Sequence, residues 1–573
     1  MTDLESGNDR RRRPTPLGRV RHLAGRVPVA LWMITGLWTA LLFGASVLWP
    51  VSYGYDEATH VDMAYQYSAH PFDFYGPGQL PYSVADVQFQ HLLPGIPPRQ
   101  PFSTAPIAAR SDRPTLAQLG GPKLESKGVP EQMVEHPPLY YWLEAIVMVL
   151  PGVSHLSWDL ELWLMRVLSV ALMIPVPGLC WEAARRLLGA DAASDPDRMP
   201  RHRPRPTRDP DRVALLAAVL PLTVPNLIRD GASVTNDALL VLATSVLLAM
   251  LARVVGGDLS RRTAGWTAVS LVVALWTKGF ALVLPPIVLA AYVVGWRCFK
   301  RDRAADDVPD ARPTIVPPLV ICLVGALLGA IWWTRNLIVY GTVQINGYGT
   351  AFSRVIYGTP TYTGSFSHFI GPFFRGLIPR IWGGIGIPDQ PAPGALIQEG
   401  WPIFVLIGIV AALVVPGTRG GRLRAWVLVA AIVLTLAVVA DGSWSDFHAW
   451  PNAIRGNQGR YFYSVIVAAA SVATVGFSRI LPRRLLACTT PVVLLLAIAT
   501  NADTWLLILR HWYQPVGHLS TLRGLADAVH GVLRWSPLPW GLTALFVFVM
   551  PVAMSLIAAA GVTWDSRRLV QKG

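Results

Sequence analysis

Long apolar stretches, each about as long as a membrane-crossing helix, recur along this 573-residue chain from Val27 to Val562. The hydrocarbon core of a bilayer is about 30 Å thick and requires roughly 20 apolar residues per helix. The chain is 52% hydrophobic and 15% charged, whereas an ordinary soluble domain is about 25% charged. Lipid is therefore the expected solvent, and the sequence predicts an all-α polytopic membrane protein with large extracytoplasmic loops.

The apolar stretches predict about 12 transmembrane helices. They are placed near residues 28 to 49, 160 to 188, 213 to 228, 238 to 255, 264 to 277, 280 to 298, 315 to 334, 401 to 416, 424 to 440, 461 to 478, 485 to 500 and 539 to 562. A further apolar run, residues 139 to 150, is short and follows Pro137 and Pro138, which suit a helix start. We expect that run to form a re-entrant or interfacial helix.

The loop charges predict which ends of the helices face the cytoplasm. Basic segments alternate with the apolar stretches at residues 1 to 27, 185 to 212, 261 to 262, 300 to 312, 419 to 424, 479 to 484 and 567 to 572. By the positive-inside rule these segments, and both termini, are cytoplasmic. The first apolar run has no cleavage site at its end, so it is expected to be a retained anchor. The net charge of +14 is thus explained by topology, and no nucleic-acid partner is predicted.

The same topology divides the chain into three parts. A cytoplasmic basic tail covers residues 1 to 27, a transmembrane module covers residues 28 to 500, and residues 501 to 573 form an outer loop, the last helix and a cytoplasmic tail. The predicted outer loops are residues 50 to 137, 335 to 400, 442 to 459 and 501 to 538. The first two are large for simple connectors, which favours a functional role. The linker 190 to 210 is expected to be disordered, and the four cysteines show no disulfide or metal-binding spacing.

The first outer loop begins with an acidic helix start that can supply a general base. Asp56 and Glu57 open it, and His60 follows Asp56 at a spacing of four, so Asp56 and His60 share one helix face. A carboxylate beside the membrane can take a proton from a hydroxyl group. The alternative is that Asp56 caps the helix while Glu57 is solvated.

The end of the same loop carries a second polar group, Glu135 and His136, followed by Tyr140 and Tyr141. Glu135 and His136 are candidate ligands of a divalent metal ion, the one cofactor that the sequence suggests. The alternative for the whole segment is an aromatic belt around a proline-started helix.

Further polar residues fall at the outer ends of later helices. Asn236 and Asp237 begin one helix, where capping is the alternative role. Lys278 lies at an outer turn. A basic residue there does not contribute to the positive-inside orientation of the chain, so an anionic partner is expected.

Two arginines complete this set. Arg335, with Asn336, and Arg460, with Tyr461, each lie at the outer end of a crossing. Arginine binds phosphate through a planar pair of donors, and the alternatives are snorkelling or a salt bridge. Carboxylates, one lysine and two arginines therefore converge on one face at one depth.

These elements together resemble the GT-C superfamily, the integral membrane glycosyltransferases that use polyprenyl-phosphate sugars, and in particular an uncharacterised bacterial GT-C-like branch. Six short motifs in order carry the resemblance: Asp56-Glu57, His136-Pro-Pro-Leu-Tyr-Tyr141, Asn236-Asp237, Thr277-Lys278-Gly279, Arg335-Asn336 with Tyr340-Gly341, and Gly459-Arg460-Tyr461-Phe462.

The resemblance implies roles for these residues. Asp56, Glu57, His60 and Asp237 are the expected catalytic groups, Lys278, Arg335 and Arg460 the donor-phosphate ligands, and His136, Tyr140, Tyr141, Asn236, Asn336 and Tyr461 the substrate cavity. The implied partners are a polyprenyl-phosphate-linked sugar, a glycan, lipid or protein acceptor of the cell envelope, and membrane lipids. The reaction is expected to invert the sugar at the outer face of the inner membrane.

Two other functions remain as alternatives. A flippase or transporter of lipid-linked glycans is predicted to have broken helices and ionisable residues near mid-span. A non-catalytic partner in envelope assembly would keep the fold without turnover.

Overall fold

The computed structural model describes residues 27–95, 100–125, 128–193, 209–305, 314–383, 394–417, 420–452, 454–514 and 521–571. These residues are predominantly helical, and their extended pairing is limited to isolated bridges, Pro81 with Pro130 and Ser83 with Leu124. The predicted tail 1 to 27 and linker 190 to 210 lie almost entirely outside the described residues. The all-α prediction is confirmed.

Nine helical segments of the described chain are long and apolar enough to cross a membrane. Their helices are α2 (Val29–Leu48), α6 and α7 (Trp158–Met173 and Val176–Ala193), α11 (Asn236–Val255), α13 (Leu284–Ala305), α18 (Trp401–Val414), α19 (Gly421–Ala449), α20 (Ile466–Ile480), α21 (Arg483–Ile508), and α23 with α24 (Trp540–Ala544 and Met550–Gln571). The chain is therefore a multi-pass membrane protein.

Two bent pairs of helices are together long and apolar enough for one further crossing each. The first pair runs through α8 (Pro210–Val213), α9 (Leu215–Val219) and a 3-10 turn, then bends by 73° into α10 (Pro225–Gly231). The second joins α14 (Val316–Gly329) to α15 (Ile331–Tyr340) with a bend of 41°. Proline explains the first bend, because Pro221 and Pro225 remove backbone donors. Asn501 donates to the carbonyl oxygen of Leu222 at 2.7 Å and so compensates at the break.

The remaining predicted crossing, 264 to 277, corresponds to α12 (Arg261–Leu275), which is 15 residues long. The count of 12 crossings therefore stays a prediction, with nine straight segments and two bent pairs observed in the described part of the chain. Residues 139 to 150 form the short helix α5 (Leu139–Met148). Two helices extend into predicted loops: α19 reaches Ala449, and α21 continues past residue 500, where Nδ2 of Asn501 donates to the carbonyl oxygen of Ala497 within the helix.

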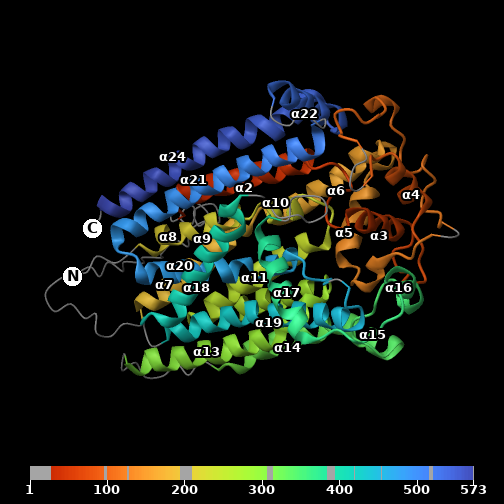
Figure 1. Cartoon of the computed structure of the whole chain (residues 1–573). Coiled ribbons are helices and arrows are strands. Elements are labelled where there is room, and N and C mark those ends of the chain that lie inside the picture. The colour runs from red at the N-terminus through yellow and green to blue at the C-terminus, as the bar shows by residue number, and fades with distance from the viewer. Residues whose placement is uncertain are drawn as a thin grey trace, which may run out of the picture.

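Short helices gather at one end of the bundle, at the right in Figure 1, opposite the end at which α24 finishes. They are α3 (Glu57–Ala69), α4 (Val84–His91), α5 and α16 (Gly349–Tyr357), while α17 (Phe366–Gly383) and α22 (Leu522–Trp535) complete the helical elements. Two of the long segments are the most buried, those containing α11 and α20, each 78% buried along its apolar window. Both segments begin at the end where the short helices gather, so the polar residues at their starts belong to the most buried helices of the fold.

Close helix contacts hold this centre together. A Cβ atom on Gly476 of α20 would lie 1.7 Å from the carbonyl oxygen of Gly408 on α18, so glycine is required there. Small residues of this kind let membrane helices approach closely.

The two ends of the chain also meet. The backbone of Ala30 on α2 donates to Asp565 on α24 at 3.3 Å, across 535 residues of sequence. At the outer end, Arg534 of α22 donates to the carbonyl oxygens of Ser103 and Ala105, which lie in the first outer loop. The last part of the chain thus clamps both the first helix and the loop that follows it.

Candidate active site

Asp56 occupies a left-handed backbone conformation, with φ 51° and ψ 26°, immediately before α3. Its side chain accepts no hydrogen bond from the helix backbone, so the alternative role of helix cap is excluded. A non-glycine residue in this conformation costs about 1 kcal/mol or more and is held by its surroundings. The turn directs the carboxylate away from its own helix.

The carboxylate of Asp56 is bound by Arg460, which comes from the opposite end of the sequence. Nη2 of Arg460 lies 2.5 Å from Oδ2 of Asp56. Arg460 lies in the 3-10 turn η8 (Gly459–Val465) at the start of α20. The turn is pressed against α17, since a Cβ atom on Gly459 would lie 2.2 Å from the backbone of Arg380.

Asp237 and Lys278 extend the ion pair into the protein. Nε of Arg460 lies 3.7 Å from Oδ2 of Asp237, and Nζ of Lys278 lies 2.8 Å from Oδ1 of the same carboxylate. Asp237 is in the first turn of α11, where Thr235 is the N-cap, and Lys278 directly precedes the 3-10 turn η6 (Gly279–Val283). Four of the predicted residues therefore form one chain of alternating charge, which we call the outer charge cluster: Asp56, Arg460, Asp237 and Lys278.

Exposure differs sharply along this cluster. The side chain of Asp56 is 43% exposed, whereas those of Arg460, Asp237 and Lys278 are exposed by 4%, 2% and 6%. Burial alone would raise the pKa of Asp56, but the charge and hydrogen bond of Arg460, aided by the charge of Lys278, hold it below its ordinary value. Asp56 is thus an ionised carboxylate at the surface end of a buried array.

Arg460 and the nearby Asp230 have side-chain atoms without a hydrogen-bond partner in the described part of the chain. Nε and Nη1 of Arg460 meet no hydrogen-bond acceptor among the described residues. Both carboxylate oxygens of Asp230 on α10 are likewise buried without a donor there. Leaving a buried charged donor unsatisfied is costly, so the guanidinium of Arg460 has capacity for a further acceptor.

Glu57, predicted as a catalytic group, lies in a buried ion pair. Arg166 of α6 binds it through Nε at 2.7 Å and Nη2 at 2.6 Å. The backbone groups of Gly54 and Val234 donate to the same carboxylate. Both oxygens are occupied and the side chain is 1% exposed, so Glu57 forms a fully hydrogen-bonded, buried ion pair with Arg166.

His60 connects the cluster to α5. Its Nδ1 lies 3.1 Å from the hydroxyl of Tyr141, and its Nε2 lies 3.5 Å from that of Thr235. Asn236 also approaches Tyr141, at 3.4 Å. Burial, followed by the charges of Lys278 and Arg460, lowers the pKa of His60 well below its usual value, so the imidazole is neutral. The neighbouring Tyr140 instead faces Ser169, at 2.9 Å, and lies outside this network.

Glu135 and His136 link the first outer loop to the second. Oε2 of Glu135 accepts the backbone N–H of Gly347 at 3.2 Å, and Oε1 lies 3.7 Å from Nε2 of His136. Burial raises the pKa of Glu135 to about 7 and, as the main cause, lowers that of His136 well below its ordinary value. Within the described ranges no group of three or more His, Cys, Asp or Glu side chains is arranged to hold a metal ion. Two ligands, one of them already hydrogen-bonded, do not fit a metal site.

Arg335 is not brought into the outer charge cluster. Its guanidinium lies 5.6 Å from the ring of Phe74 and 5.1 Å from that of Trp332, and it donates to the side chain of Asn336 at 3.1 Å. Asn336 in turn donates to the carbonyl oxygen of Val343, so it fixes the turn after α15. Tyr461, in contrast, is at the site, with its ring 5.4 Å from Nζ of Lys278.

Sequence reasoning missed three residues around this site: Arg166, Asp230 and Thr235. A charge inside the apolar run 160 to 188 was the available signal for Arg166, because ionisable residues in membrane segments mark pairs or sites. Asp230 carried the same signal beside α10.

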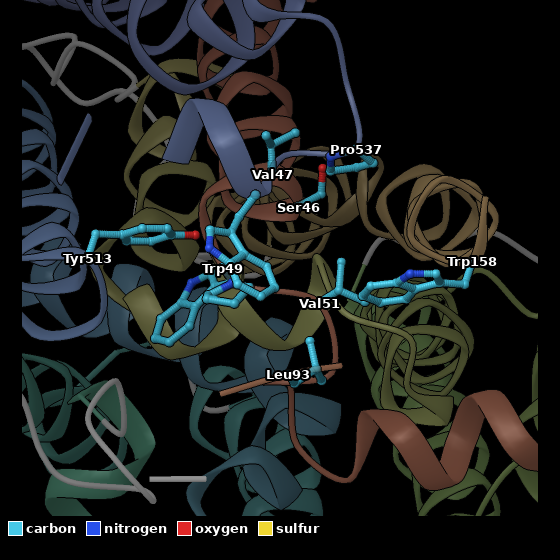
Figure 2. A pocket seen from close by; sticks show the side chains of 10 residues that line it. Ser46, Val47, Trp49, Val51, Leu93, Trp158, Tyr513 and Pro537 are labelled. Carbon is cyan, nitrogen blue, oxygen red and sulfur yellow. The ribbon is translucent and has the colours of Figure 1, made fainter. Parts of the chain in front are cut away.

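A separate small pocket lies at the outer end of α2 and is shown in Figure 2. Trp49, Val51, Trp158 and Tyr513 are among the ten residues that line it, and none of the ten belongs to the outer charge cluster. The pocket adjoins the Glu57–Arg166 pair instead, because Arg166 donates to the carbonyl oxygens of Ser46 and Trp49.

No family model and no curated protein matches this sequence. Solved structures do show similarity over most of the chain. ArnT from Cupriavidus metallidurans bound to undecaprenyl phosphate aligns with 94% of this chain and 77% of its own, at 15% identity and a TM-score of 0.43. The arabinosyltransferase EmbB from Mycobacterium smegmatis aligns with 93% of this chain and 41% of its own, at 14% identity and a TM-score of 0.35.

The archaeal oligosaccharyltransferase AglB from Archaeoglobus fulgidus, in complex with an inhibitory peptide and a dolichol-phosphate, aligns with 93% of this chain and 56% of its own, at 13% identity and a TM-score of 0.36. These proteins are GT-C glycosyltransferases, the superfamily that the sequence motifs resemble. Because every one of these TM-scores is below 0.5, the likeness carries no argument about activity, and the function is argued from this chain's own residues.

Proposed function

We propose that this protein is a GT-C-type glycosyltransferase that moves a sugar from a polyprenyl monophosphate to an envelope acceptor at the extracytoplasmic membrane face. The observation that carries the proposal is the contact between Asp56, an exposed carboxylate, and Arg460, a buried guanidinium with vacant donors. A base and an anion ligand side by side are the groups that transfer from a phosphate leaving group requires.

Arg460 and Lys278 are the proposed ligands of the donor phosphate. Arginine and lysine form short, charge-assisted hydrogen bonds to phosphate oxygens. Their position in a dry part of the protein strengthens this interaction, because little solvent screens it. Negative charge grows on the phosphate as the sugar leaves, and the two cations stabilise that charge.

Asp56 is the proposed general base. The acceptor hydroxyl gives its proton to Asp56 while its oxygen forms a bond to the anomeric carbon. The bond from that carbon to the phosphate oxygen breaks, and its electron pair stays on the polyprenyl phosphate. Attack from the face opposite the phosphate inverts the anomeric configuration. Asp237 holds Lys278 in place, while His60 and Tyr141 support the start of α11 through Thr235 and Asn236.

The position of the cluster suits a lipid-borne donor. Asp237 and Arg460 begin two central membrane-crossing segments at the end where the short outer helices gather (Figure 1). A polyprenyl chain can remain in the bilayer while its phosphate reaches this level. The positive-inside pattern then assigns this end to the extracytoplasmic side of the inner membrane.

A transporter of lipid-linked glycans is the second candidate, and the break at α10 is the observation that favours it. Broken helices at mid-membrane line the substrate sites of many transporters. Against this, the charges nearest the break, Arg229 and Asp230, belong to the same polar region as Asp237 and Arg460, since these groups interact electrostatically. The ionisable residues nearest the break thus belong with the outer charge cluster, at one end of the bundle.

The decisive experiment incubates the purified protein with radiolabelled polyprenyl-phosphate sugars and envelope glycan or lipid acceptors. Transfer of label to an acceptor supports the proposal. Movement of the lipid across vesicle membranes without transfer would support the transporter. Absence of both activities, with the lipid still bound, would favour a non-catalytic assembly role.

A further inference from the structure

The proposed base and the proposed phosphate ligand are each other's partner. In the structure Oδ2 of Asp56 accepts a hydrogen bond from Nη2 of Arg460, at 2.5 Å. That bond is the one the Asp56 side chain makes within the described part of the chain. A carboxylate held by a guanidinium in this way is a weaker proton acceptor than a free one.

The partnership is unequal. Arg460 is almost fully buried, and the ring of Tyr55 lies 4.8 Å from its guanidinium carbon. Its Nε and Nη1 donors have no acceptor in the described chain, and its second carboxylate neighbour, Asp237, lies at 3.7 Å. Arg460 is thus fixed in place and able to bind another anion, whereas Asp56 faces solvent.

Other charged or titratable groups also face Asp56, and they set the background against which Arg460 acts. They are Lys278, His136, Glu135, Tyr461, Tyr348 and Tyr357. His136 is neutral because it is buried beside cations. Of the two permanent cations near Asp56, Arg460 is therefore the one in direct contact.

From this geometry we infer that the Arg460–Asp56 contact is self-inhibitory and that the donor phosphate relieves it by taking Arg460. A phosphate that binds Nη1 and Nη2 together shares the guanidinium that otherwise serves Asp56 alone. Asp56 then regains proton affinity at the moment when the sugar is in place. The inference rests on the proposed function, and it adds that the acceptor is activated only after the donor binds.

Carbodiimide labelling of the purified full-length protein tests this inference, because carbodiimides react with protonated carboxyl groups. The probe is undecaprenyl phosphate without a sugar, compared with undecaprenol, which has the same chain and no phosphate. Label at Asp56 is measured by peptide mass spectrometry at about pH 6, with the exposed Asp73 as internal control. Undecaprenyl phosphate should raise labelling of Asp56 by about tenfold for each unit by which its pKa rises, while undecaprenol and Asp73 show no change.

Binding of undecaprenyl phosphate is measured in parallel by native mass spectrometry. If the lipid binds and labelling of Asp56 stays constant or falls, the inference is overturned and the proposed function stands. If the lipid does not bind, both are overturned. Arg460→Gln adds a second comparison: its Asp56 should label at the high rate without lipid, and a low rate in a folded variant would contradict the inhibitory contact.

Discussion

Asp56 and Glu57 are neighbours in the chain, and each is paired with an arginine, yet the two pairs differ in almost every physical respect. Arg166 uses all five of its donors: Nε and one Nη2 hydrogen bind Glu57, and the other three reach the carbonyl oxygens of Ser46, Trp49 and Pro50. Arg460 uses Nη2 and leaves Nε and Nη1 without acceptors in the described residues.

The difference shows how to separate a structural ion pair from a functional one. A buried pair whose donors and acceptors are all satisfied has nothing left to offer a ligand. A pair with vacant donors persists at a cost in stability, and such sites are expected where a ligand completes the set. By this criterion Glu57 and Arg166 hold the loop that carries Asp56, while Asp56 and Arg460 are the pair that we propose to meet the substrate.

The largest effect is expected for Asp56→Asn. The loss of a positioned base should reduce turnover by about 10²- to 10⁴-fold, with little change in thermal stability, because asparagine tolerates the same left-handed backbone. Initial rates with a lipid-linked donor and the melting temperature are measured side by side. Asp73→Asn is the matched control, since that side chain is 59% exposed and outside the cluster. Normal turnover by a folded Asp56→Asn variant would contradict a functional role for the Asp56–Arg460 pair.

The opposite pattern is expected for Arg166→Met. Removing one partner of a buried pair costs about 3–5 kcal/mol, because the remaining charge is left uncompensated. The variant should melt at a clearly lower temperature, and adding Glu57→Leu should restore part of the loss. Thermal denaturation of the purified variants in detergent provides the measurement. A single variant as stable as the parent protein would show that this pair does not hold the loop.

A smaller effect is expected on lipid binding, and it should differ between the cations Lys278 and Arg335. Lys278→Gln should weaken binding of undecaprenyl phosphate by about 10- to 100-fold, since a hydrogen bond to a charged group contributes about 1.5–3 kcal/mol. Arg335→Gln is the matched control and should change binding by less than about threefold, within the uncertainty usual for a surface charge. Native mass spectrometry of lipid occupancy measures both. Equal losses of lipid binding in the two variants would indicate that Arg335 also binds the phosphate.

The smallest effect is expected for Glu135, whose largely buried carboxyl group accepts a backbone hydrogen bond from Gly347. Folding raises its pKa from 4.5 to about 7, so its ionisation makes the folded state less stable as pH rises through this range. Glu135→Gln should therefore raise the melting temperature at about pH 8 and leave it unchanged near pH 4.5. A difference that does not depend on pH would contradict the raised pKa.

The membrane segments could be predicted from the sequence because lipid demands long apolar runs, and those runs are visible without any alignment. The apolar run near 28 to 49 became α2, and the runs near 238 to 255 and 461 to 478 became α11 and α20 with its preceding turn. The predicted ends were less accurate where a polar side chain lies inside the bundle. Asn501 is such a case, because its amide nitrogen donates to two backbone carbonyl oxygens and the helix continues.

The proximity of Asp56, Asp237, Lys278 and Arg460 could also be predicted, since all four fall at helix ends on the face opposite the basic loops. The long-range partners of individual residues could not be predicted. Arg166 meets Glu57 across 109 residues, and no local spacing encodes such a contact. Arg335 shared the position of Arg460 in the topology, but α15 bends by 41° from α14, and a bend of this kind leaves no simple signal in the apolar pattern.

The contact between α2 and α24 has a consequence for biogenesis. Ala30 enters the membrane 535 residues before Asp565, its hydrogen-bond partner, is synthesised. Arg534 contacts the first outer loop through the carbonyl oxygens of Ser103 and Ala105, so the surroundings of the turn at Asp56 are incomplete until residue 534 has been synthesised. A nascent chain that ends before α22 would lack this clamp even if its first helices were already inserted in the membrane.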